Sequence, residues 1–210
     1  MEKSIVIQLH TKYHTLGELS EQTEQIWFAL HGYGQLAEFF ARKFDFLDKR
    51  KYYVIAPQGL NKFYLKEFSG RVGANWMTKE DRLNEIANYV NYLNSIYKKE
   101  LEGIDLQKVK INVLAFSQGC STASRWIANT DLRFDELLLW AGEIPQDVIG
   151  QPIFKTIPTT FVMGTQDELL SAAFVEAFLE RLKLFQLHPK IIRFEGKHEI
   201  DKDVLKALIY

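Results

Sequence analysis

Short apolar runs of β-forming residues alternate along this chain with longer stretches whose apolar residues recur at helical spacing. The runs typical of buried strands are Ile26–Leu30, Tyr52–Ala56, Ile111–Phe116, Leu137–Trp140, Thr159–Met163 and Lys190–Phe194. Strands that are apolar throughout are buried on both faces, as in a parallel sheet covered by helices. The alternation therefore predicts an α/β fold with an open, mostly parallel central sheet and helices on both of its faces.

The stretches between these strands predict amphipathic helices. Thr78 and Asp81 resemble a capping box ahead of a long helix, and a second helical pattern follows Ser171. Ser4–His10 is a candidate antiparallel strand at the edge of the sheet. The 210 residues contain no internal repeat, low-complexity tract or linker, so we expect one domain over residues 1–210.

Charge and cysteine content narrow the classes of binding partner and the cellular compartment. There are 26 basic and 27 acidic residues, a net charge of −1, which gives no electrostatic footprint for nucleic acid or an anionic membrane. The single cysteine, Cys120, excludes an internal disulfide and fits a reducing compartment. No apolar run approaches the about 20 residues of a membrane span. The N-terminus has an apolar run of only three residues before Gln8, shorter than the roughly 7–15 of a secretory signal. We therefore expect a cytoplasmic protein with no membrane span.

Ligands of an open parallel sheet bind beyond the carboxyl ends of its strands, so the residues at those ends are the candidates for chemistry. Ser117, Asp167 and His198 each follow a predicted strand, in the chain order of α/β-hydrolases. Taken singly, the serine could be a turn residue, the aspartate a helix cap and the histidine an ordinary surface imidazole. The three together, in this order, favour a nucleophile with its base and its acid.

The residues around Ser117 support this interpretation. A nucleophile on a sharp strand-to-helix turn needs small neighbours two positions before and after it, and here these are Ala115 and Gly119. A serine hydroxyl needs a base, which His198 would supply, while Asp167 would orient the imidazole. The backbone N–H groups of Tyr33 and Gln118 are the expected oxyanion donors, because glycines flank Tyr33 and Gln118 follows the nucleophile.

Four motifs, LHGYG (30–34), FSQG (116–119), GTQDELL (164–170) and GKHEI (196–200), resemble the small carboxylesterase/phospholipase family of α/β-hydrolases, which includes acyl-protein thioesterases. The resemblance spans Leu30 to Ile200 and implies an α/β-hydrolase domain, with Ser117, Asp167 and His198 as the catalytic triad and Tyr33 and Gln118 as oxyanion donors. The chain departs from the family pattern at Gln35, at Cys120 and in the short Gly-Lys-His run, which bears on substrate preference and loop geometry.

Several other residues have competing interpretations. His31 is expected to support its loop, and Cys120 to point into the packing. Glu168 and Asp201 are weaker candidates than Asp167 for the acid, because Glu168 lies further from the strand end and Asp201 suits a helix N-cap.

The aromatic segment 60–76 reads as a long loop that forms either a satellite apolar cluster or a wall or flap of an acyl pocket. In the second interpretation Trp76 and Phe63 contact the substrate. The space between Trp140 and Thr159 is too short for a large cap domain. No metal or phosphate motif is present in the sequence, so we expect neither a metal nor a cofactor.

The leading hypothesis is a serine hydrolase that cleaves a small-molecule carboxylic ester through an acyl-enzyme. A thioesterase using the same triad and a non-catalytic binding protein with a hydrolase fold are the alternatives. The sequence leaves a homo-oligomer open.

Overall fold

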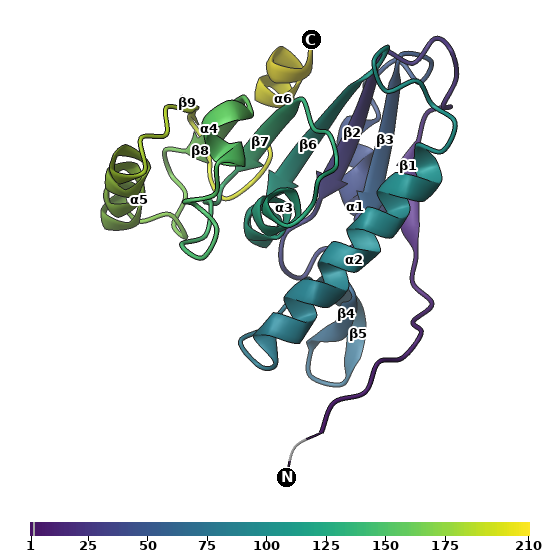
Figure 1. Ribbon diagram of the computed structural model, residues 1–210. Helices are drawn as coiled ribbons and strands as arrows, with labels where there is room; N and C mark the ends of the chain where they lie inside the picture. The colour runs from purple at the N-terminus through teal and green to yellow at the C-terminus, as the bar shows by residue number, and fades with distance from the viewer. Residues whose placement is uncertain (2) are drawn as a thin grey trace.

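The computed structural model describes Met1 and residues 3–210. Its central sheet has seven strands in the order β1-β3-β2-β6-β7-β8-β9 (Figure 1). Their bounds are β1 Tyr13–Leu16, β2 Gln25–Leu30, β3 Tyr52–Pro57, β6 Lys110–Phe116, β7 Glu136–Trp140, β8 Thr159–Gly164 and β9 Lys190–Phe194. β1 pairs antiparallel with β3, and every other neighbouring pair in this sheet is parallel. The mostly parallel α/β sheet predicted from the sequence is confirmed.

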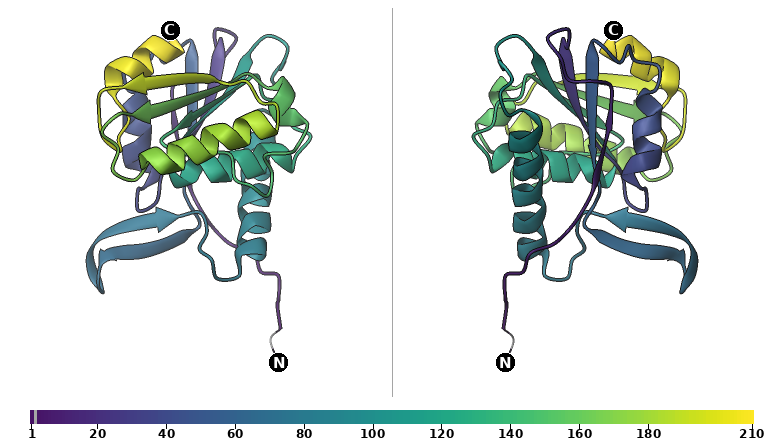
Figure 2. Two further views of the ribbon diagram at one scale, coloured as in Figure 1. Left: turned by 90° about the vertical axis from the view of Figure 1, so that its left-hand side faces the viewer. Right: turned by 90° about the vertical axis from the view of Figure 1, so that its right-hand side faces the viewer.

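Helices cover both faces of the sheet (Figures 1 and 2). They are α1 Ala37–Ala41, followed by the 3₁₀ turn η1 Arg42–Phe44, α2 Arg82–Glu100, α3 Gln118–Ala128, α4 Ile153–Thr156, α5 Ala172–Leu184 and α6 Lys202–Ile209. Along β2, Ile26 and Phe28 join an apolar cluster with α2, α3 and α5, whereas Trp27 joins a second cluster with α1 and α6. Alternate strand residues thus face opposite helical layers, which explains why the strands are apolar throughout.

The edge strand lies later in the chain than expected. Ser4–His10 is not a strand, and β1 instead spans Tyr13–Leu16. The partner strand sets this position, because Tyr13 lies opposite Pro57, the last residue of β3. Residues ahead of Lys12 extend past the end of β3 and have no strand beside them among the described residues.

Residues 60–76 form a hairpin rather than a long loop. β4 (Asn61–Lys66) pairs antiparallel with β5 (Ser69–Asn75), and the pair projects from the body as an arm (Figure 2). Glu67 adopts a left-handed conformation at the tip, with φ of 47°. The Glu67-Phe68 turn lacks the Asn-Gly or Asp-Gly signal of a tight hairpin, which is why the sequence pattern reads as a loop.

The capping box expected at Thr78 and Asp81 does not form. Asp81 precedes α2 with φ of 48° and its side chain makes no capping bond. The Thr78 N–H donates instead to the carboxylate of Glu85 at 2.5 Å. At the other end of the chain, Asp201 caps α6 through the N–H groups of Asp203 and Val204.

The segment between β7 and β8, described throughout, holds the short helix α4 rather than a cap domain. Among the described residues, no helix is both long and apolar enough to cross a membrane. The carboxyl ends of β2, β6, β8 and β9 therefore share one edge of the sheet without a separate domain over them.

Candidate active site

Ser117 occupies a strained turn between β6 and α3. Its φ of 53° and ψ of −119° lie in a region that residues other than glycine rarely adopt. Its N–H donates to the Trp140 carbonyl at 2.8 Å. A Cβ on Gly119 would come within 2.5 Å of the Leu30 carbonyl oxygen. A side chain at that position would push α3 away from β2, so the small residue predicted there is a steric requirement.

Ser117, His198 and Asp167 form a continuous hydrogen-bonded chain. The Ser117 Oγ lies 2.9 Å from Nε2 of His198, and Nδ1 of the same ring lies 2.7 Å from Oδ2 of Asp167. Asp167 follows β8 and His198 follows β9, so three separate strand ends supply the three groups. The Asp167 side chain is fully buried, whereas 22% of the His198 side chain remains exposed. Solvent therefore reaches the imidazole but not the carboxylate.

Other contacts fix the orientation of the acid and the base. The second carboxylate oxygen of Asp167 accepts the N–H of Leu169 at 2.9 Å, and the His198 ring packs against Phe116 with centroids 5.0 Å apart. The weaker acid candidates lie elsewhere, because Glu168 is exposed and Asp201 caps α6.

The loop after β2 lies directly against the nucleophile. A Cβ on Gly32 would be 2.9 Å from Cδ1 of Phe116 and 3.2 Å from the Cβ of Ser117, so a larger residue would crowd both side chains. The Gly32 N–H donates to the side chain of Gln35 at 2.8 Å, and the Gly34 N–H donates to the Ala74 carbonyl at 2.8 Å. Within the described residues, the intervening N–H of Tyr33 and the N–H of Gln118 have no acceptor. Both donors stay available, the one directly after Ser117 and the other directly after Gly32, which packs against Ser117.

His31 supports this loop from beneath. Its Nε2 accepts the Gly59 N–H at 2.9 Å, and its Nδ1–H donates to the Gly32 carbonyl at 2.8 Å. Burial lowers the pKa of His31 to about 4, because a charged imidazole would lose its hydration. His31 is therefore neutral near pH 7, and its two ring nitrogens have fixed roles as donor and acceptor.

The structure places Trp76 behind the loop rather than in a substrate pocket, which corrects the expectation from the sequence. Trp76 is 1% exposed, and its indole N–H donates to the His31 carbonyl at 2.8 Å. Phe63 lies on β4 with its ring 5.1 Å from that of Tyr33, and it is half-buried. Of the two aromatic residues, only Phe63 keeps surface beside the loop.

The side chain of Gln118 is a feature that the sequence analysis missed. Its Oε1 accepts the Trp76 N–H at 3.1 Å and its Nε2 donates to the Met77 carbonyl at 2.8 Å. These bonds tie the first residue of α3 to the end of β5. The contact joins residues 41 positions apart, and no local pattern signals it.

Cys120 has no access to the site. It is fully buried, its Sγ contacts the carbonyl oxygens of Ala115 and Trp140, and burial raises the pKa of the thiol. The expectation that it points into the packing agrees with this position.

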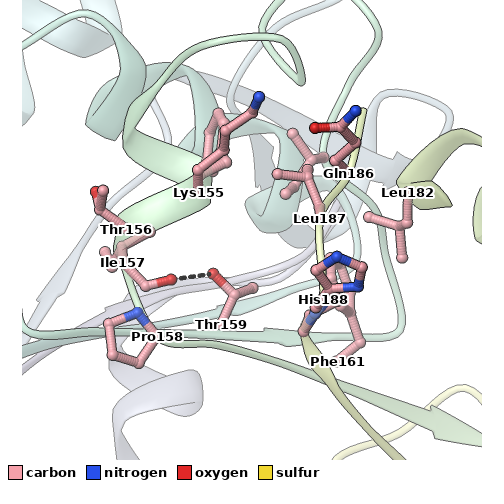
Figure 3. A pocket seen from close by; sticks show the side chains of 13 residues that line it. Lys155, Thr156, Ile157, Pro158, Thr159, Phe161, Leu182, Gln186, Leu187 and His188 are labelled. Atoms are coloured by element: carbon pink, nitrogen blue, oxygen red, sulfur yellow. Dashed lines mark hydrogen bonds between the residues drawn. The ribbon is translucent and has the colours of Figure 1, made fainter. Parts of the chain in front are cut away.

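A cavity of about 240 Å³ lies elsewhere, between the segment before β8 and the end of α5. Its lining runs from Ile144 to Pro189, and Figure 3 shows Lys155, Gln186 and His188 around it. Ser117 and His198 are not among its lining residues. The hydrogen-bonded chain, rather than the cavity, therefore defines the candidate site.

Comparisons with known proteins agree with this fold. The family model described as serine hydrolase (FSH1) matches residues 22–203. The chain superposes on acyl-protein thioesterase 2 from Zea mays with a TM-score of 0.67 at 13% identity, over 95% of this chain and 96% of that one. Esterase PE8 gives a TM-score of 0.70 at 17% identity, over 96% and 98%.

A phospholipase/carboxylesterase from Dyadobacter fermentans gives 0.67 at 16% identity, over 97% and 96%. At these identities the superpositions show a shared fold, the α/β-hydrolase fold. No curated protein matches the sequence.

Proposed function

The chain belongs to the serine hydrolase (FSH1) family, and from this premise we propose that it hydrolyses small carboxylic esters with Ser117 as nucleophile, His198 as base and Asp167 as the acid that orients the imidazole. The observation that carries the proposal is the hydrogen-bonded chain from Asp167 through His198 to Ser117, with distances of 2.7 and 2.9 Å. These lengths suit proton transfer between a hydroxyl and an imidazole.

In the first half of the reaction, Nδ1–H of His198 faces the Asp167 carboxylate, which leaves the lone pair of Nε2 toward the Ser117 hydroxyl. Oγ bonds to the ester carbonyl carbon while its proton passes to Nε2. The buried Asp167 carboxylate stabilises the imidazolium that forms. The imidazolium then gives its proton to the leaving alkoxide as the C–O bond breaks.

The N–H groups of Tyr33 and Gln118 are proposed to hold the negative oxygen of the tetrahedral intermediate. Gln118 directly follows Ser117 and Tyr33 directly follows Gly32, which packs against Ser117, and neither N–H has another acceptor among the described residues. Their positions are set before substrate binds, by Gln35 and Ala74 on one side and by the Gln118 side chain on the other. Donors fixed in advance stabilise the developing charge without reorganisation, which is the main source of their effect.

In the second half of the reaction, water replaces the alcohol. His198 is partly exposed, so water reaches its Nε2, which takes a proton as the oxygen attacks the acyl carbon. Collapse of this second intermediate releases the carboxylic acid and returns the proton to Ser117. Phe63, beside Tyr33, is proposed to contact the substrate, whereas Trp76 acts through the loop that it supports.

The test is covalent labelling with a fluorophosphonate, followed by mass spectrometry, alongside hydrolysis of p-nitrophenyl acetate, butyrate and octanoate. We expect one adduct on Ser117 and turnover of at least one ester. Ser117→Ala should lose both, while Ser69→Ala, an exposed serine on the hairpin, should retain both. A folded parent protein that neither labels nor turns over an ester would favour the non-catalytic binding protein instead.

A parallel assay with acyl thioesters of matched chain length separates the two ester classes. We expect kcat/KM to be higher for the oxygen esters. The opposite order, with labelling of Ser117 intact, would assign the same triad to a thioesterase.

A further inference from the structure

The residues ahead of β1 form an extended arm with an apolar surface. This N-terminal arm, Ser4–His10, leaves the body at the edge of the sheet and is not paired as a strand (Figures 1 and 2). The exposed fractions of its large side chains are high: Ile5 86%, Val6 97%, Ile7 73% and Leu9 61%. A contiguous apolar surface of this kind on a folded protein usually marks an interaction site.

The arm has the alternation of a strand with one apolar face. Ile5, Ile7 and Leu9 fall on the same side as Tyr13 of β1 if the extended backbone continues. The other side carries mainly polar residues. The apolar face of the arm therefore continues the Tyr13 face of β1, and the arm would need the edge of a sheet to pair with.

The arm cannot supply this partner by folding back on its own β1. The carbonyl of Lys12 accepts the Gln58 N–H at 3.3 Å and the Tyr92 hydroxyl at 2.8 Å, which holds Lys12 in line with β1. A hairpin here would need a tight turn through His10–Lys12, and this stretch has none of the Gly, Asn or Asp residues that such turns require. The arm therefore points away from the outer edge of its own strand.

That outer edge is open. β1 is the terminal strand of the sheet and pairs only with β3 among the described residues. Because the Lys12 carbonyl points toward β3, alternation along the strand turns the N–H and C=O groups of Tyr13 and Thr15 outward. Tyr13–Leu16 contains no Lys, Arg, Asp or Glu, the residues that protect an edge strand from pairing.

We propose that the N-terminal arm pairs with the outer edge of β1 in a second copy of this chain, forming a two-fold antiparallel dimer centred on His10. In this register Ile7 lies opposite Tyr13 of the second copy and Ile5 lies opposite its Thr15. The outward backbone groups of these residues then bond to one another. Each copy gives its arm and receives its partner's, so the interface is self-complementary.

Charge favours a second copy over an anionic lipid surface. Between Ser4 and Leu16 the one Lys, Arg, Asp or Glu is Lys12, which would lie opposite the uncharged Gln8. The arm itself has none of these residues, so it offers nothing to attract an anionic lipid surface. Self-pairing therefore brings no like charges together.

Disulfide trapping tests the register. His10→Cys places two thiols at a non-hydrogen-bonded pair across the two-fold axis, where the Cα separation of about 4.5 Å allows a disulfide. We expect mild oxidation to convert most of this variant to a covalent dimer. The native Cys120 is buried and should not compete. Gln8→Cys is the matched control, because the same residue in the two copies would be roughly 13 Å apart.

Sedimentation or light scattering of the full-length protein tests the interface itself. We expect twice the monomer mass, and at least a 10-fold weaker dimer for the Ile7→Lys/Leu9→Lys variant. Leu83→Lys, at an exposed leucine on α2, should dimerise normally. Circular dichroism checks that all variants fold. A monomeric parent, or equal cross-linking of His10→Cys and Gln8→Cys, would overturn the proposal.

Discussion

At the residue scale, Ser117 holds a backbone conformation that costs on the order of 1–3 kcal/mol, and the surrounding contacts maintain it. Its N–H bonds to Trp140, and glycines at positions 32 and 119 admit the neighbouring backbone. This backbone conformation points the Ser117 Oγ toward Nε2 of His198, 2.9 Å away. Single substitutions that break a hydrogen bond within this small group of residues should therefore lower kcat.

Asp167→Asn is the first such substitution. An amide in place of the carboxylate would favour the wrong tautomer of His198, so Nε2 would no longer accept the proton of Ser117. We expect kcat for the best p-nitrophenyl ester to fall by roughly 10⁴-fold. Glu168→Gln, at the exposed neighbour, should change kcat less than about twofold. Comparable losses in the two variants would argue against Asp167 as the orienting acid.

Gln118→Ala tests a positioning role for the Gln118 side chain. Without its bonds to Trp76 and Met77, the start of α3 would lose its tie to β5, and the proposed oxyanion donor, the Gln118 N–H, would be less well fixed. We expect kcat to fall by about 10- to 100-fold with little change in KM. A rise in KM with kcat unchanged would indicate a role in binding substrate instead.

At the scale of elements, the ends of β2, β6, β8 and β9 and the start of α3 meet at one edge of the sheet. α3 can approach β2 only because Gly119 has no side chain, and the hairpin β4–β5 joins the loop after β2 through Gly34 and Ala74. The hairpin therefore forms part of the wall around the candidate oxyanion hole. Changes in how these elements pack should alter stability and activity together.

Gly119→Ala measures this coupling. The added methyl group would lie 2.5 Å from the Leu30 carbonyl oxygen and would force α3 outward. We expect a loss of roughly 1–3 kcal/mol in the free energy of unfolding, measured in urea. We also expect kcat to fall by a larger fraction of its parent value than the free energy of unfolding does. Ser121→Ala, on the same helix, should leave both nearly unchanged. An unchanged stability for Gly119→Ala would show that α3 can shift without penalty.

The sequence predicted the elements better than their connections. All six apolar runs coincide closely with β2, β3, β6, β7, β8 and β9. Five of these strands, all but β9, are buried on both faces and so have a strong local signature. The hairpin was missed because its turn lacks the usual Asn-Gly or Asp-Gly signal, and the position of β1 was missed because it depends on pairing with the distant β3. The same holds for the burial of Trp76, which follows from its bond to the His31 carbonyl.

At the scale of the whole molecule, the sheet separates two apolar clusters, and His31 lies fully buried at the edge where the candidate site forms. Its pKa of about 4 in the folded protein is below the usual 6.5, so the unfolded chain binds a proton that the native protein does not. Between these two pKa values, protonation of His31 therefore favours unfolding.

We expect His31 to make the protein less stable as pH falls from about 6.5 to about 4, by ~3 kcal/mol in total, with no contribution above that range. Urea unfolding at several pH values measures this slope. His31→Gln should flatten it, whereas His188→Gln, at an exposed histidine, should not. An equally steep slope in His31→Gln would assign the acid sensitivity to other groups.

The sequence by itself determined the class of fold, because the alternation of apolar strands with amphipathic helices is a local pattern that only a covered parallel sheet satisfies. It also determined which residue types follow the strands, and so predicted Ser117, Asp167 and His198 as partners. Only the tertiary structure decided their separations, the burial of Trp76, the ties made by Gln118 and the free edge of β1. These depend on contacts between segments far apart in the chain, and such contacts leave no periodic trace in the sequence.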